Sequence, residues 1–197
     1  MQKIFFFSLF FSIFTSLYAQ PKKYIQNLKT FQKLYIKNHE VVVEKDKKHF
    51  RFFPVNEHYK VNAGFKKLTD NIGFEMKTSG TKIKKYFRYG TLHFTLHDST
   101  LQLTLYQSEA LLKDSSFKRY LFLPFTDATS GEESYGGGRY IDLEMDDIKD
   151  NYILIDFNKA YNPYCAYTTG YNCPVPPREN NLPVAVTAGE KDFGKSH

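Results

Sequence analysis

The sequence predicts a mainly β protein, either an antiparallel barrel or a two-sheet sandwich, with one N-terminal amphipathic helix and a long C-terminal loop. Phe and Tyr supply all of its 17% aromatic content, which favours strands. From Tyr59 onward, apolar and polar residues alternate with a period of two in a series of short segments. The 197 residues show no internal repeat or dividing linker, so residues 20–197 are expected to form a single domain.

The first 19 residues have the pattern of a secretory signal peptide. Lys3 precedes the apolar run Ile4–Leu17, and Ala19 is a small residue for cleavage before Gln20. The run is short for a membrane span, so we expect cleavage, a secreted or periplasmic protein and no stable membrane span afterwards; an uncleaved anchor is the alternative. Removing Lys3 changes the net charge from +6 to +5, and the other lysines lack the aromatic interleaving of a nucleic-acid-binding surface.

Residues 22–38 are expected to form an amphipathic helix, because apolar side chains recur there at helical spacing. A hairpin with a two-residue Ser79-Gly80 loop follows, which would place Met76 opposite Ile83.

A second hairpin is expected to turn at Asp98-Ser99 and to place Phe94 opposite Leu103. This pairing gathers six apolar side chains on one face. They are Leu92, Phe94, Leu96, Leu101, Leu103 and Leu105.

Three more strands are expected in the second half of the chain. The segment 120–125 is apolar on both faces, which predicts a central strand covered on both sides. Segments 140–145 and 152–157 complete the sheet, and residues 109–113 are expected to form a short helical turn.

A glycine-rich loop precedes one of these strands. The N–H groups of Gly136, Gly137 and Gly138, beside the guanidinium of Arg139, would cradle a carboxylate, a phosphate or a sugar oxygen. Arg139 shares the apolar face of its strand, so it needs an acidic partner. That partner is either an anionic ligand or a carboxylate of the chain in a structural pair. The carboxylates considered are Asp127, Asp156 and Glu179.

The loop from Asn158 to about Leu182 is long for a compact domain, which indicates a functional or stapled segment. Its two cysteines, Cys165 and Cys173, have a spacing that suits neither a zinc knuckle nor a thioredoxin-type pair. Two cysteines in an exported chain predict a disulfide, with reactive thiols or metal ligands as alternatives. We expect no metal site and no cofactor.

These features predict a pocket for a small polar or anionic ligand, including a glycan, on which tyrosines would stack. The alternatives are an exported hydrolase, with Asp and Glu as acid and base or with Ser130 activated by His93, and an interaction module of the cell envelope. The candidate ligand-binding residues are Asp127, Thr129, Ser130, Tyr135, Gly136, Gly137, Gly138, Arg139, Asp156, Asn158, Tyr161, Glu179 and Asn180.

Several long motifs resemble the bacterial family known as domain of unknown function 1684. They are FRFFP at 50–54, LPFxD at 123–127, SYGGGRYxD at 134–142, DFNxAYNPxCAY at 156–167 and CPxPPxEN at 173–180. The resemblance runs from about Tyr24 to Lys191 and implies no established reaction. The family includes members without an evident export signal that keep both cysteines, which favours thiol or metal chemistry in those members; the signal peptide here favours the disulfide.

Overall fold

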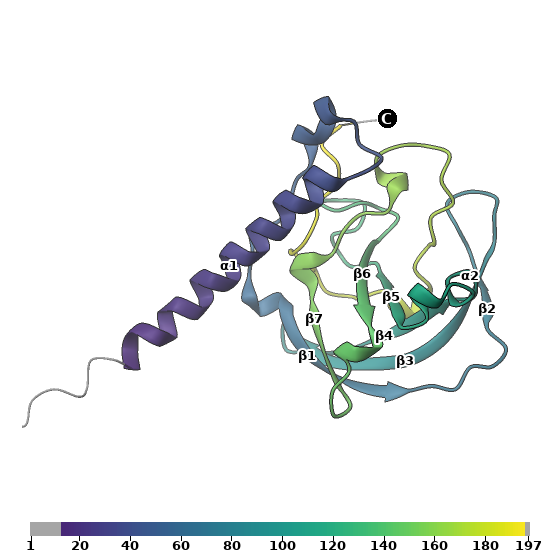
Figure 1. Ribbon diagram of the computed structural model, residues 1–197, viewed down its shortest axis with the longest axis horizontal. Coiled ribbons are helices and arrows are strands. Elements are labelled where there is room, and N and C mark those ends of the chain that lie inside the picture. The colour runs from purple at the N-terminus through teal and green to yellow at the C-terminus, as the bar shows by residue number, and fades with distance from the viewer. Residues whose placement is uncertain (1–12, 196–197) are drawn as a thin grey trace, which may run out of the picture.

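The computed structural model describes residues 13–195, with side chains from residue 22 onward, so residues 1–12 of the expected signal peptide lie outside the described part. Seven strands form one antiparallel sheet in the order β6-β5-β4-β3-β1-β7, and the short β2 pairs with β3. The sheet curls into a half-barrel, and helix α1 lies diagonally beside it (Figure 1). The strands are β1 Lys60–Lys67, β2 Phe74–Met76, β3 Lys84–Leu96, β4 Ser99–Ser108, β5 Tyr120–Phe125, β6 Arg139–Glu144 and β7 Tyr152–Asp156.

The core fills the inner face of the curled sheet. The six apolar side chains of the β3–β4 hairpin all belong to it, as the alternation predicts, together with β5 and the segment 182–188. Each fully buried Leu contributes about 1.5–3 kcal/mol relative to an exposed one. The mainly β, antiparallel prediction is therefore confirmed.

The β3–β4 hairpin forms, but its predicted register is wrong by two residues. Phe94 pairs with Leu101 instead of Leu103, because the turn lies at His97 and Asp98. Both turn residues have positive φ, 50° and 59°, which is the backbone of the tight turn that fits twisted strands. A shift of two residues preserves the side-chain face, so the core composition remains as predicted.

The β2–β3 register is wrong by one residue. Met76 pairs with Lys84 and not with Ile83. The loop is longer than the predicted two residues, and it also bonds to the C-terminal loop: Ser79 N donates to Cys173 O at 2.8 Å, and Thr78 bridges Pro174.

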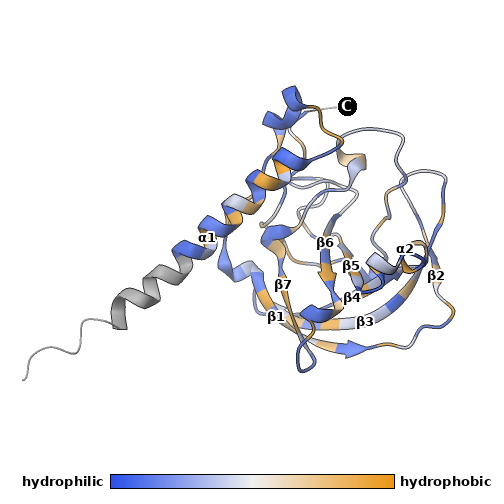
Figure 2. Ribbon diagram, in the orientation of Figure 1, coloured by the Kyte–Doolittle hydropathy of each residue, from blue (hydrophilic) through white to orange (hydrophobic). Residues whose placement is uncertain are grey.

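The expected helices are present. Helix α1 spans Ile13–Asn38, so it starts before the predicted 22–38, and α2 spans Glu109–Leu112. Figure 2 shows mostly hydrophilic residues along the described part of α1, with apolar residues at intervals. In the described part of the chain, no helix is long and apolar enough to cross a membrane.

Strand β5 is buried on both faces, as predicted, although it lies next to the edge of the sheet. Pro124 in β5 has no N–H to donate to β4. The Asn180 side chain lies between the two strands: its amide donates to Pro124 O at 2.6 Å and to Thr104 O at 2.9 Å, and it accepts from Thr104 N. Asn180 thereby replaces part of the backbone ladder.

Candidate functional site

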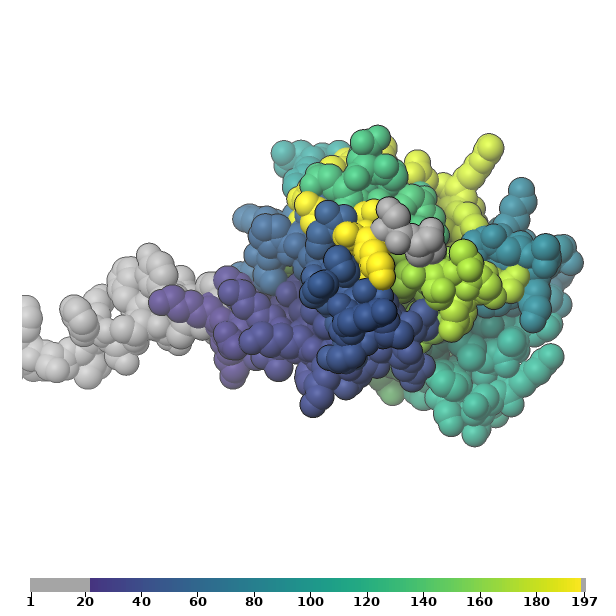
Figure 3. All heavy atoms as spheres, turned by 90° about the horizontal axis from the view of Figure 1, so that it is seen from above, coloured from purple at the N-terminus to yellow at the C-terminus, as the bar shows by residue number. Residues whose placement is uncertain are grey.

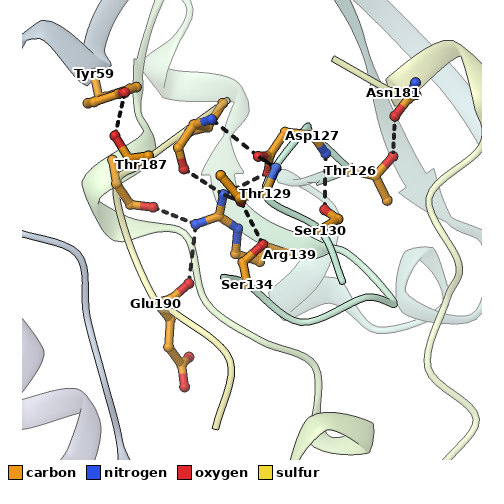
Figure 4. A network of polar contacts seen from close by, with 12 residues as sticks. Tyr59, Thr126, Asp127, Thr129, Ser130, Ser134, Arg139, Asn181, Thr187 and Glu190 are labelled. Carbon is orange, nitrogen blue, oxygen red and sulfur yellow. Dashed lines mark hydrogen bonds and ion pairs between the residues drawn. The ribbon is translucent and has the colours of Figure 1, made fainter. Parts of the chain in front are cut away.

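Arg139 is a fully buried residue whose two terminal nitrogens bond to protein atoms, whereas its Nε atom has no hydrogen-bond partner in the described part of the chain. Its guanidinium pairs with Asp127 at 2.7 Å and donates to the carbonyls of Val186, Ala188 and Glu190 (Figure 4). Burial lowers the pKa of Arg139, and Asp127 opposes that change. The pair that the sequence offered as the structural alternative is therefore the arrangement observed, with Asp127 as the partner.

The glycines before Arg139 also pack against the chain. Gly138 has φ of +86°, and an added Cβ would lie 2.6 Å from Pro176 Cγ and 2.7 Å from Phe125 O. Tyr135 covers Gly137 with its ring and packs against the aromatic cluster at the end of α1. Gly137 and Gly138 therefore contact protein atoms, Gly136 is exposed, and none of the three lines one of the pockets described below.

The hydroxyl groups after β5 stabilise the turn around Asp127. Ser130 Oγ accepts from Asp127 N at 3.1 Å, and Thr129 Oγ1 bonds to Ser134 Oγ at 2.8 Å. His93 bonds to Thr91 instead of to Ser130. Among residues 13–195, no Ser130–His93 hydrogen bond is formed.

Three further candidate residues bond to parts of the chain distant in sequence. The Asp156 carboxylate accepts from the Tyr24 hydroxyl at 3.0 Å and from the Asn158 amide, which fastens α1 to the end of β7. Glu179 accepts from Arg88 at 3.3 Å and from the Tyr106 hydroxyl at 3.0 Å.

The predicted disulfide between Cys165 and Cys173 is present. It closes a loop that includes Tyr171, and Cys173 lines a pocket of about 1000 Å³. The bond therefore stiffens one wall of this pocket.

A pocket of about 1000 Å³ lies between α1, the edge of β6 and the loop that follows β7. Figure 3 shows the dark blue end of α1 beside the yellow C-terminal segment. Of the predicted ligand-binding residues, Tyr161 lines this pocket. Other aromatic side chains surround it: Phe31, Tyr35, Tyr140, Tyr164 and Tyr171.

Asp142 provides a carboxylate to this pocket. The hydroxyls of Tyr120 and Tyr161 donate to its Oδ1 atom at 2.6 and 2.7 Å. No donor among the described residues bonds to its Oδ2 atom. Burial and the nearby Asp142 charge raise the pKa of Tyr161 well above its usual value, so this hydroxyl remains a donor at neutral pH.

Three lysines surround the same space: Lys82, Lys84 and Lys159. Within residues 13–195, none of them has a carboxylate oxygen within 4 Å, whereas several other lysines do. Burial and the neighbouring charge of Lys82 lower the pKa of Lys84. Sequence reasoning missed these residues because isolated lysines in a lysine-rich chain have no distinguishing pattern.

A buried carboxyl group lies behind the pocket wall. Glu190 is 0% exposed and accepts from Asn162 N at 2.9 Å, from the Tyr167 hydroxyl at 2.7 Å and from the Tyr35 hydroxyl of α1 at 3.2 Å. Burial raises its pKa to about 7, against the effect of these donors. The sequence analysis did not select Glu190, which stands alone between Gly189 and Lys191 with no motif around it.

His39 lines the pocket but is held as a neutral ring. Its Nδ1 atom accepts from Val42 N at 3.1 Å, and burial lowers its pKa to about 4. Four aromatic rings surround it. The positive charge at the pocket therefore comes from the lysines.

Residues 46–191 match the family described as protein of unknown function (DUF1684). The chain belongs to this family. No curated protein matches it. A similar solved structure is that of the uncharacterised protein from gene locus rrnAC0354 of Haloarcula marismortui, which is 32% identical over 88% of this chain and 96% of that one, with a TM-score of 0.65. Neither description names an activity.

Proposed function

We propose that this protein binds a small anionic ligand in the pocket between α1, β6 and the loop after β7. The observation that carries the proposal is the group of three lysines around an aromatic cavity, none of which has a carboxylate oxygen of residues 22–195 within 4 Å. A surface ammonium without a partner costs little, but several of them around one concave site favour an anion. A secreted or periplasmic location, expected from residues 1–19, is part of the proposal.

The tyrosines supply the remaining recognition. Tyr161, Tyr164 and Tyr171 present flat apolar faces together with hydroxyl groups, which suits a planar or ring-shaped ligand. A volume of about 1000 Å³ accommodates a ligand of several tens of atoms. Binding is preferred to the hydrolase hypothesis because Ser130 and His93 bond to other partners, as do Asp127, Asp156 and Glu179.

The test is titration of the full-length, isotopically labelled chain with inorganic phosphate, benzoate and glucuronate, followed by amide NMR shifts. We expect at least one probe to shift amides of the loop 161–174 and of β6. The combined Lys82→Ala and Lys84→Ala substitutions are expected to weaken binding by about tenfold or more, since a hydrogen bond to a charged group contributes about 1.5–3 kcal/mol.

The matched control is Lys66→Ala, which removes one exposed lysine outside the pocket and should leave the dissociation constant unchanged. Binding should also weaken with added salt. The proposal is wrong if none of the probes shifts these amides, or if the double lysine variant binds as tightly as the unmodified chain.

A further inference from the structure

The pocket continues into a second cavity beneath α1. This cavity, of about 480 Å³, shares Phe31, Ile141, Asp142 and Lys159 with the pocket of about 1000 Å³, so the two form one groove. Helix α1 forms one wall from Tyr24 to Asn38. At about 1.5 Å per residue this wall is about 21 Å long, which exceeds the length of a single sugar ring.

Asp142 lies where the two cavities meet, and its backbone faces the groove. Tyr140 N and O bond to Tyr161 O and N, so the backbone groups of Tyr140 point away from β5. Residues two apart in an antiparallel strand point their backbone groups the same way. The N–H and C=O of Asp142 therefore also point away from β5, at the free edge of β6. Among the described residues, neither is bonded to another backbone group.

One residue thus presents a donor and two kinds of acceptor at the centre of the groove. The acceptors are the free Oδ2 atom and the carbonyl oxygen, and the donor is the N–H. Unsatisfied polar groups of this kind require partners when a ligand displaces water from them. An acyl chain offers none, whereas the hydroxyl groups of a sugar both donate and accept.

Charge differs between the two ends of the groove. Among the charged residues that line one cavity only, Lys82, Lys84 and Glu40 belong to the larger cavity. Asp147, Asp156 and Lys60 belong to the smaller one, so the larger cavity carries one net positive charge and the smaller one net negative charge. An anionic group is therefore favoured at the lysine end and a neutral, hydroxyl-bearing group at the other. Between the ends, the Lys159 ammonium lies 5.8 Å from the centroid of the Phe31 ring, and this ring is 36% exposed. A partly exposed aromatic ring at this position suits stacking on a sugar.

We propose that this groove binds an acidic oligosaccharide of at least two units, with its anionic unit at Lys82 and Lys84 and a neutral unit against Asp142 in the smaller cavity. This inference rests on the proposed function, and it specifies the class of the ligand and its orientation in the groove.

Isothermal titration of the full-length chain with four probes tests it: glucuronate, a disaccharide of glucuronate linked to glucose, neutral cellobiose, and laurate. The disaccharide is expected to bind at least about tenfold more tightly than glucuronate, since the second unit adds hydrogen bonds to the charged Asp142. Cellobiose lacks the anion and is expected to bind more weakly than the disaccharide.

Asn27→Trp places a large side chain at the smaller cavity from an exposed position of α1. This variant is expected to remove the tenfold advantage of the disaccharide and to leave glucuronate binding unchanged. Gln26→Trp is the control, because Gln26 is an exposed neighbour that lines neither cavity.

The outcomes separate the two proposals. If glucuronate binds and the disaccharide binds no more tightly, the oligosaccharide inference is overturned while anion binding stands. Tighter binding of laurate than of the disaccharide also overturns it and indicates an amphipathic lipid. If the Asn27→Trp and Gln26→Trp variants lose affinity for the disaccharide equally, the second unit is not bound in the smaller cavity. If no anionic probe binds, both proposals fail.

Discussion

Replacing Arg139 with Met is predicted to destabilise the fold by about 3–5 kcal/mol, the usual cost of leaving one buried charge without its partner. Met retains most of the side-chain volume but removes the guanidinium, so the Asp127 carboxylate loses its ion pair at 2.7 Å. The carbonyls of Val186, Ala188 and Glu190 lose donors as well. Each carbonyl that stays unbonded and dry adds about 1 kcal/mol or more. A domain of this size is stable by about 5–15 kcal/mol, so the variant is expected to approach the limit of folding.

The assay is urea unfolding followed by far-UV circular dichroism, because the chain contains no Trp to report by fluorescence. A second variant combines Arg139→Met with Asp127→Asn and so removes both charges of the pair. It is expected to be more stable than Arg139→Met alone by about 2 kcal/mol, since contacting residues couple on this scale.

The reasoning is refuted if Arg139→Met lowers the free energy of unfolding by less than about 1 kcal/mol, the ordinary effect of a point substitution. It is equally refuted if the double variant is no more stable than the single one. Loss of anion binding in a variant of unchanged stability would return Arg139 to a ligand-binding role.

Three other predictions concern stability and the pocket wall. Burial raises the pKa of Glu190 to about 7, so the contribution of its protonated form to stability is complete below pH about 4.5 and is lost as the pH rises to about 7. Glu190→Gln should flatten this part of a stability–pH profile measured by thermal melting. Cys165 and Cys173 should react with an alkylating reagent only after reduction, as measured by intact mass, and labelling without reduction would contradict this. Replacing both with Ser should lower the free energy of unfolding by about 2.5 kcal/mol and weaken anion binding. Asn180→Ala leaves buried backbone groups of β4 and β5 without partners and should cost about 2–4 kcal/mol in urea unfolding, and a cost below about 1 kcal/mol would show that water replaces the amide.

Arg139 shows how much the local residue pattern predicts about a buried charge. Alternation along the strand places Arg139 on the apolar face, and elementary electrostatics then requires a carboxylate or an anionic ligand beside it. The observed partner, Asp127, was one of the three carboxylates that the sequence offered. Local pattern does not choose between a protein carboxylate and a ligand, because that choice depends on which segments cover the site. Here the segment 186–190 covers it.

The two hairpins show the same limit: the side-chain faces of β3 and β4 follow from the sequence pattern, but the strand registers do not. Side chains along a strand alternate between the two faces of the sheet, so the sequence pattern predicts which side chains of β3 and β4 enter the core. Register depends on turn geometry and on competing bonds. His97 and Asp98 adopt positive φ in one turn, and Ser79 bonds to Cys173 across the fold in the other.

The sequence by itself therefore predicted the mainly β fold class and the side chains of β3 and β4 that enter the core, and it favoured the disulfide between the two cysteines over free thiols or metal ligands. The tertiary structure alone decided the place of the pocket, because its lysines, tyrosines and Asp142 come from α1, the β2–β3 loop, β6 and the loop after β7. The lysines and Asp142 look like ordinary surface residues within their own segments, whereas Tyr161 was a candidate from the sequence. Their chemistry arises only from long-range contacts, which are set by the packing of α1 against the edge of a curled sheet and are not encoded in any local period.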